Sequence, residues 1–102
     1  MKSKILNSLI SEVTKKAYQN YHEWMQSDVD IASQLRDGIR MASSAFDEIE
    51  PINDRISILK EMKDRIQEVL KYYRSLPGEA GTWECSALSI IDREINRLIS
   101  EN

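Results

Sequence analysis

Cys85 and His22 are the residue pair in this chain whose types could support nucleophilic catalysis, because an imidazole can remove the proton of a thiol. Cys85 is expected near the start of a helix, where the helix dipole favours a thiolate. The sequence offers no residue that would orient His22 and no group for an oxyanion, and the adjacent Glu84 disfavours a thiolate. We therefore predict an inert cysteine and assign no catalytic residue. One cysteine and one histidine also cannot complete a structural zinc site.

Two acidic segments could bind a magnesium ion. Residues 47–50 (Asp-Glu-Ile-Glu) and 61–64 (Glu-Met-Lys-Asp) resemble the paired acidic motifs of all-α nucleotide pyrophosphohydrolases, which would imply a metal-dependent hydrolase. Such an enzyme would use Glu61, Asp64 and Glu68. Pro51 interrupts the helix directly after the first segment, and the helical rise would separate the two segments by about 16 Å, too far for one ion to bridge. The carboxylates are expected on solvated faces, with Glu61 paired to Arg65, and no metal or other cofactor is predicted.

Six of the seven aromatic residues are expected at one end of the fold, which we call the aromatic pole (Tyr18, Tyr21, Trp24, Tyr72, Tyr73 and Trp83). If four helices run alternately up and down, the ends of the first and third helices meet the start of the fourth there. Tyrosine and tryptophan are common where one protein grips another. They can also stack on a planar ligand while a basic side chain meets its phosphate. The candidate binding residues are Tyr18, Tyr21, His22, Trp24, Lys71, Tyr72, Arg74 and Trp83.

Three interpretations of this pole stay open. The aromatic side chains could plug the end of the hydrophobic core, form a protein-binding surface, or line a pocket for a small ligand. A flat or convex patch would favour a protein partner, whereas a concave pocket faced by Lys71 or Arg74 would favour a ligand. Tyr72 and Tyr73 are adjacent and cannot both point inward, so at least one is expected at the rim.

The spacing of apolar residues predicts four helices. The first, about residues 3–25, places on one face Leu6, Ile10, Val13, Ala17, Tyr21 and Trp24. The second begins at Ser27, and its stripe is rotated by about 100° from a continuation of the first, which favours a break. That stripe consists of Ala32, Leu35, Ile39, Ala42, Phe46 and Ile49.

The third helix is expected to begin at Pro51, or slightly later with Asn53 as its cap. Its apolar seam consists of Ile52, Leu59, Met62, Ile66, Val69, Tyr73 and Leu76. A loop follows at residues 76–81, and Thr82 is expected to cap the fourth helix. The inner face of that helix is Leu88, Ile91, Ile95 and Leu98.

Short connections favour antiparallel neighbours, so residues 1–102 are predicted to form one all-α domain, an up-and-down antiparallel four-helix bundle. The alternative is a long helical hairpin, with the first two helices fused, that completes its core by dimerisation. Several apolar residues lie beside the main stripes and could leave apolar area exposed, which predicts a homo-oligomer. These residues are Ile5, Leu9, Ile58, Ile90 and Ile99.

Composition narrows the function. The 102 residues carry a net charge of −3, and the basic residues are scattered, so no nucleic-acid polymer is expected as a partner. No run approaches the roughly 18 apolar residues of a membrane span, and the interrupted apolar start does not resemble a signal peptide, so a cytoplasmic location is expected. We predict a small acidic non-enzymatic protein that binds another protein, as inhibitors, immunity-type proteins and adaptors do. The alternatives are sequestration of a small aromatic or nucleotide ligand at the same pole and, less favoured, metal-dependent nucleotide hydrolysis.

Overall fold

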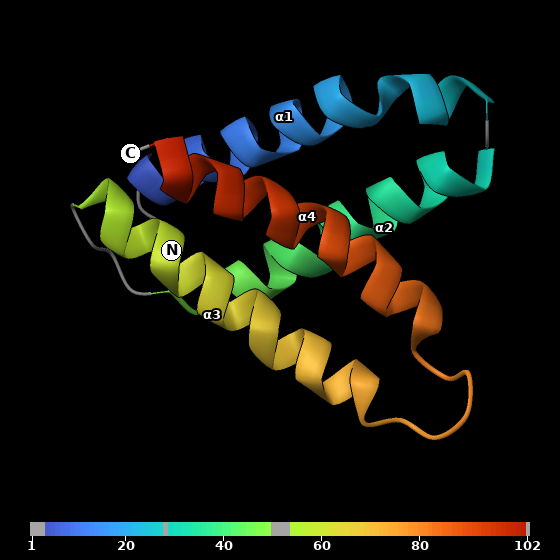
Figure 1. Cartoon of the computed structure of the whole chain (residues 1–102). Helices are drawn as coiled ribbons and strands as arrows, with labels where there is room; N and C mark the ends of the chain where they lie inside the picture. Colours follow the sequence, from blue (N-terminus) through green and yellow to red (C-terminus); the bar gives the residue numbers. More distant parts are fainter. Residues whose placement is uncertain (1–3, 28, 50–53, 102) are drawn as a thin grey trace.

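The protein is a bundle of four helices (Figure 1). The computed structural model describes residues 4–27, 29–49 and 54–101, with the side chains of all of these except residues 22–27 and 29–32. The helices are α1 (Lys4–Ser27), α2 (Val29–Phe46), α3 (Arg55–Arg74) and α4 (Thr82–Glu101). Each helix runs opposite to the one before it, which confirms the predicted up-and-down bundle. The alternative in which the first two helices fuse is wrong, because α2 turns back from the end of α1.

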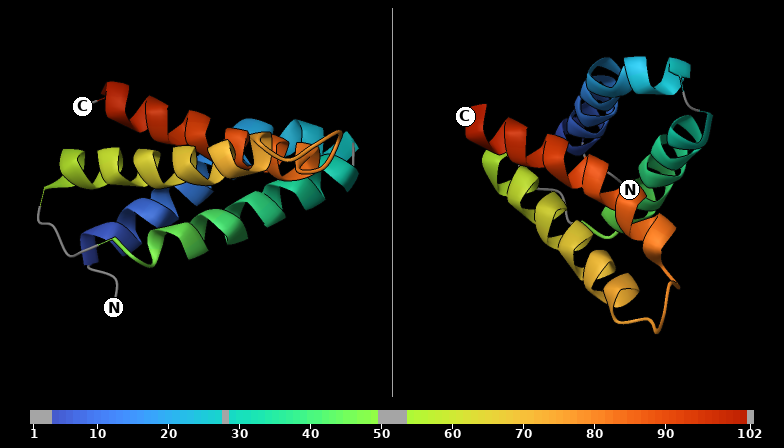
Figure 2. Two further views of the ribbon diagram at one scale, coloured as in Figure 1. Left: turned by 90° about the horizontal axis from the view of Figure 1, so that it is seen from below. Right: turned by 45° about the vertical axis from the view of Figure 1, so that its right-hand side comes forward.

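Helix α4 is the central helix of the bundle. It packs most extensively against α2 and α3, whereas α1 and α3 make the least contact with each other. The end of α1 and the loop between α3 and α4 lie at the same end of the molecule but on opposite sides of it (Figures 1 and 2). The helix ends at the aromatic pole therefore do not converge as the sequence had led us to expect.

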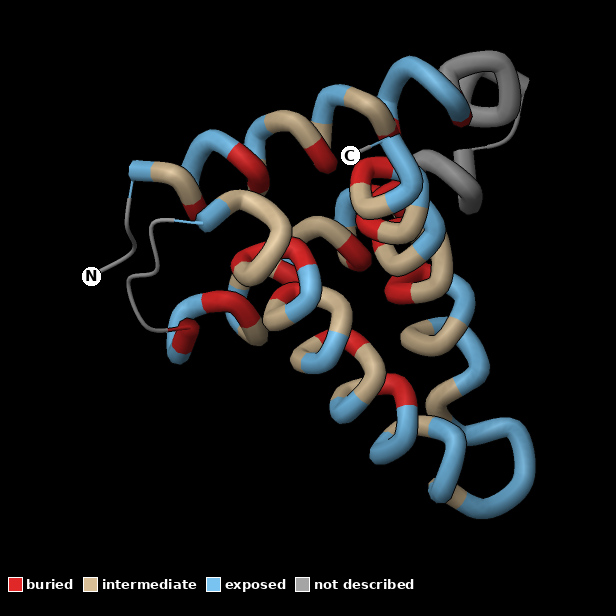
Figure 3. Tube along the Cα trace, turned by 60° about the vertical axis from the view of Figure 1, so that its left-hand side comes forward, coloured by how far each residue is buried: buried red, intermediate tan, exposed pale blue. Residues whose placement is uncertain are grey.

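The core is built from the inner faces of all four helices (Figure 3). The predicted inner face of α4 is confirmed, since Leu88, Ile91, Ile95 and Leu98 are fully buried. The predicted seam of α3 is shifted: Ile58 and Leu70 are fully buried, whereas Val69 and Tyr73 are only half-buried. On α1, Leu9 is fully buried and Ile10 only half-buried.

The start of α3 lies later than either predicted position. Asp54 is the residue before the first helical turn, with an extended backbone (φ −115°, ψ 116°), and its carbonyl oxygen accepts a hydrogen bond from the amide of Ile58 at 3.0 Å. Extended geometry cannot continue a helix, so α3 starts at Arg55. Ile52, Pro51 and the predicted cap Asn53 lie outside the described residues.

The start of α4 also differs from the prediction. Thr82 is the first helical residue, and its hydroxyl donates to the carbonyl oxygen of Glu79 at 2.8 Å instead of capping the helix. Gly81 precedes it with φ +82°, a conformation that side chains rarely adopt, and a Cβ there would lie 2.7 Å from the carbonyl oxygen of Tyr73. Thr82 is therefore not the cap, because Gly81 is the residue before the first helical turn and its carbonyl oxygen accepts the hydrogen bond from the amide of Cys85 at 2.9 Å.

Helices α2 and α4 approach each other closely at Gly38. A Cβ built on this buried glycine would lie 2.5 Å from the carbonyl oxygen of Ala87, far inside van der Waals contact. The absence of a side chain at Gly38 therefore sets the distance between the two helices. None of the helices in the described ranges combines the length and the apolar character that a membrane span requires.

Candidate binding groove along helix α4

The predicted site residues with described side chains fall into different environments. Tyr21 is 4% exposed and belongs to the core. Tyr18, Tyr72 and Trp83 are 40%, 60% and 39% exposed, which makes them the exposed large hydrophobic residues of the described chain. The core-plug interpretation therefore fits Tyr21 but not these three. The side chains of His22 and Trp24 lie outside the described residues.

A groove of about 580 Å³ runs along one face of α4, and we call it the α4 groove. Helix α4 contributes to it Thr82, Cys85, Ser86, Ser89, Ile90 and Arg93. These positions recur at three- and four-residue steps, so they form one helical face. The facing wall consists of Tyr21 of α1, Gln34 of α2 and Tyr73 and Arg74 of α3. The loop after α3 closes one end with Leu76, Gly78, Ala80 and Gly81.

The α4 groove brings together only part of the predicted site. Tyr21 and Arg74 line it, whereas Tyr18, Lys71 and Tyr72 do not. Tyr72 stands next to the groove, because its ring packs edge-to-face on the ring of Tyr73 with 5.2 Å between centroids. Sequence reasoning missed Ser86, Ser89 and Arg93. The sequence does contain a sign of this face, because small side chains recur at helical spacing on the side of α4 that is not apolar.

A second hollow continues the groove towards Trp83. It has a volume of about 510 Å³ and is lined by Gln34, Glu79, Thr82, Trp83 and Ser86. Three of these residues also line the α4 groove, so the two hollows adjoin each other on the surface, and we call the two together the channel. The indole nitrogen of Trp83 donates to Asp37 of α2 at 3.2 Å, which fixes the indole at the edge of this hollow.

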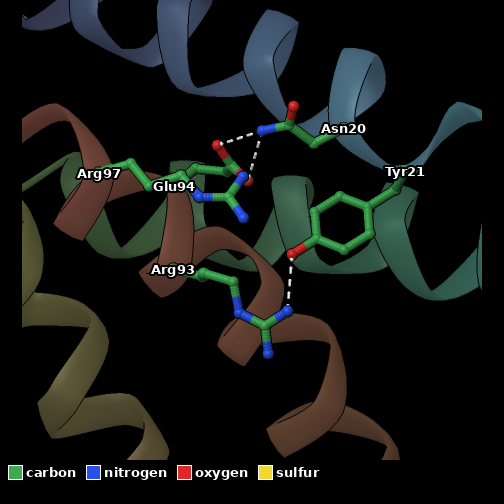
Figure 4. Close-up of polar contacts among 5 residues, drawn as sticks. All are labelled: Asn20, Tyr21, Arg93, Glu94 and Arg97. Atoms are coloured by element: carbon green, nitrogen blue, oxygen red, sulfur yellow. Dashed lines mark hydrogen bonds and ion pairs between the residues drawn. The ribbon is translucent and has the colours of Figure 1, made fainter.

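The charged side chains that line the α4 groove are both arginines, Arg74 and Arg93, among the described residues. Arg93 donates to the hydroxyl of Tyr21 at 3.1 Å (Figure 4). Arg74 makes no hydrogen bond or ion pair in the described part of the chain, and Arg93 has no carboxylate partner there. Two strong donors therefore line this groove with no counter-ion among the described side chains.

A buried carboxylate fixes α1 against α4 beside the groove. Glu94 is 1% exposed, and its two carboxylate oxygens accept hydrogen bonds from the amide nitrogen of Asn20 at 3.0 and 2.9 Å (Figure 4). Arg97 donates to the same carboxylate at 2.8 Å. Asn20 directly precedes the groove residue Tyr21 in the sequence, and Glu94 directly follows the groove residue Arg93. This contact therefore positions two groove residues relative to each other.

The described residues provide no arrangement suited to a metal or a nucleophile. No group of three His, Cys, Asp or Glu side chains among them lies close enough to hold a metal ion. Asp64 and Glu68 are exposed, so they do not share an inner face with Glu61 as a metal enzyme would need. The predicted pairing of Glu61 with Arg65 is wrong, because Arg65 pairs with Glu48 at 3.3 Å. Cys85 is half-buried in the wall of the groove.

Comparisons with known proteins found no matching family model and no significant match to a curated protein or a solved structure. The function is therefore argued from the groove itself.

Proposed function

We propose that this protein is not an enzyme and acts by binding an extended segment of a partner protein in the α4 groove. The observation that carries the proposal is the shape of that groove. Its α4 face extends from Thr82 to Arg93, which corresponds to about 16 Å of helix. An extended peptide advances by about 3.3 Å per residue, so the groove matches about five residues. Inhibitory, immunity-type or adaptor roles would all use this binding step.

Two exposed aromatic residues support the proposal. Trp83 lines the hollow that continues the groove, and Tyr72 stands beside the groove on the ring of Tyr73. Both rings are held by contacts within the protein, through Asp37 for Trp83 and through Tyr73 for Tyr72. A rigid aromatic side chain loses little conformational entropy on binding, which is why such residues anchor protein interfaces.

A second candidate function is sequestration of a small aromatic or nucleotide ligand. It is favoured by one observation: Arg74 lines a concave surface, where it could meet the phosphate of a bound ligand. The length of the channel favours a peptide segment, since a small ligand would fill only part of it.

The test begins with purification of the protein from its native cell, with mass analysis of both the proteins and the small molecules retained. Calorimetry with the recovered partner then compares the parent protein with Tyr72→Ala and Trp83→Ala. We expect each change to weaken binding by about 1 to 3 kcal/mol. Tyr72→Ala should leave stability unchanged, because Tyr72 is mostly exposed, whereas Trp83→Ala also removes the contact with Asp37.

The matched control is Asp64→Ala, which changes an exposed residue of α3 outside the channel and should bind like the parent. If both aromatic variants also bind like the parent, the proposed function is wrong. If a small molecule is retained without a protein, the second candidate replaces it.

A further inference from the structure

We infer that the α4 groove selects a partner segment that carries negatively charged side chains, carboxylates or phosphates, and that Arg74 and Arg93 bind these groups. The inference rests on the proposed function, since it specifies the chemistry of the segment that the groove receives.

The first argument is the sign of the charge in the groove. The whole chain carries a net charge of −3, with seventeen acidic and fourteen basic residues. The charged side chains among the described residues of the groove are nevertheless both cationic. This local reversal of charge favours an anionic ligand over a neutral or cationic one.

The second argument is that these two arginines have no carboxylate partner among the residues whose side chains the structure describes. Four of the other five arginines are paired with carboxylates, Arg40 with Asp37, Arg55 with Glu12, Arg65 with Glu48 and Arg97 with Glu94, whereas Arg36 donates to the hydroxyl of Ser33. Arg93 instead uses one donor on the hydroxyl of Tyr21. A guanidinium has five N–H donors in a planar fork, so most of the donors of Arg93 remain for a bidentate contact with an anion.

The third argument is that the remaining groove residues complement such a segment. Arg93 is held by a tyrosine that is itself 4% exposed, so the direction of its guanidinium is partly fixed. Ser86, Ser89 and Gln34 add neutral donors and acceptors for the backbone of an extended peptide. Glu79 lines only the adjoining hollow beside Trp83, so a negative charge is favoured near the arginines and disfavoured in that hollow.

The experiment uses Cys85 as a reporter, because it is the single cysteine of the chain and lies in the groove wall. The rate of its modification by a maleimide is measured with a hexapeptide that alternates Glu and Val. The matched peptides replace each Glu with Gln or one Glu with phosphoserine, and inorganic phosphate is tested alone. We expect the Glu peptide to slow modification in a saturable way and the Gln peptide to have at least about tenfold lower affinity. A tighter phosphoserine peptide would identify phosphate as the preferred source of charge.

The variants are Arg74→Gln and Arg93→Gln, with Lys71→Gln as a control of equal charge change on an exposed residue outside the groove. Each arginine variant should weaken the Glu peptide by about 10- to 100-fold, whereas Lys71→Gln should not. Arg74 is exposed and makes no hydrogen bond or ion pair among the described residues, so its variant should fold, and circular dichroism with urea melts verifies this for both.

Several outcomes would overturn the inference. Equal affinity of the Glu and Gln peptides, no protection of Cys85 by either, or parent-like binding by both arginine variants would each show that the groove does not select charge. The proposed function would then still be decided by Tyr72→Ala and Trp83→Ala. Protection by inorganic phosphate equal to that of the peptides would replace the peptide segment with a small anion.

Discussion

Truncation of Ile66 should lower the free energy of unfolding. This residue lies fully buried in the middle of α3, so Ile66→Ala would leave a cavity and lower the free energy of unfolding by about 2 to 5 kcal/mol. Ile90→Ala should cost much less, because Ile90 is half-buried and lines the open groove. Urea denaturation measures both. Equal losses would mean that the inner faces are misassigned.

Glu12 provides a pH-dependent contribution to stability. Two hydrogen bonds of 3.0 Å from the guanidinium of Arg55 lower the pKa of the Glu12 carboxyl below its ordinary value, and burial opposes this effect only in part. A lowered folded pKa means that the contribution is complete above the unfolded pKa of about 4.3 and is lost as the pH falls through the folded pKa. Both side chains are partly exposed, so solvent screening limits the effect.

We therefore expect Glu12→Gln to reduce the free energy of unfolding by no more than about 1 kcal/mol at neutral pH. The difference from the parent should vanish once the pH is well below the folded pKa of Glu12. Urea melts across this range provide the measurement. A difference that stays constant with pH would show that Glu12 acts through packing and not through its charge.

At the scale of the helices, Gly38 decides how closely α2 can approach α4. Gly38→Ala would gain up to about 1 kcal/mol of helix propensity, but the new Cβ would clash with the carbonyl oxygen of Ala87. Overpacking of this kind typically costs about 1 to 3 kcal/mol, so we expect a net loss of stability in thermal melts. Adding Ala87→Gly should not restore it, because the nearest atom belongs to the backbone. A stabilised Gly38→Ala protein would contradict the close approach.

The spacing of apolar residues was sufficient to predict the helices and the inner face of α4, because burial on a helix repeats with the helical period. The helix starts were less predictable, since each depends on the backbone of one residue, as at Asp54 and Gly81. The small side chains on one face of α4 were visible in the sequence, but the groove that they line was not predictable. It results from the angle at which whole helices diverge, and this angle depends on contacts between distant segments, such as Gly38 with Ala87.

At the scale of the whole molecule, less apolar surface is exposed for self-association than the sequence predicts. Leu9 and Ile58 were expected to leave apolar area exposed, but both are fully buried, and Ile5, Ile90 and Ile99 pack partly against the core. We therefore expect the chain by itself to be a monomer with a mass near 11.8 kDa in light scattering at micromolar concentration. A mass near twice this value would instead restore the predicted homo-oligomer.

The central position of α4 also has a consequence for synthesis on the ribosome. Helices α2 and α3 make their most extensive contacts with α4, which is the last of the four to be translated. Until α4 has left the exit tunnel, the apolar faces of α2 and α3 lack the helix against which they pack most extensively. Domains fold as units, so the nascent chain presents an unfinished apolar surface to chaperones throughout translation of α1 to α3 and closes it only after α4 emerges.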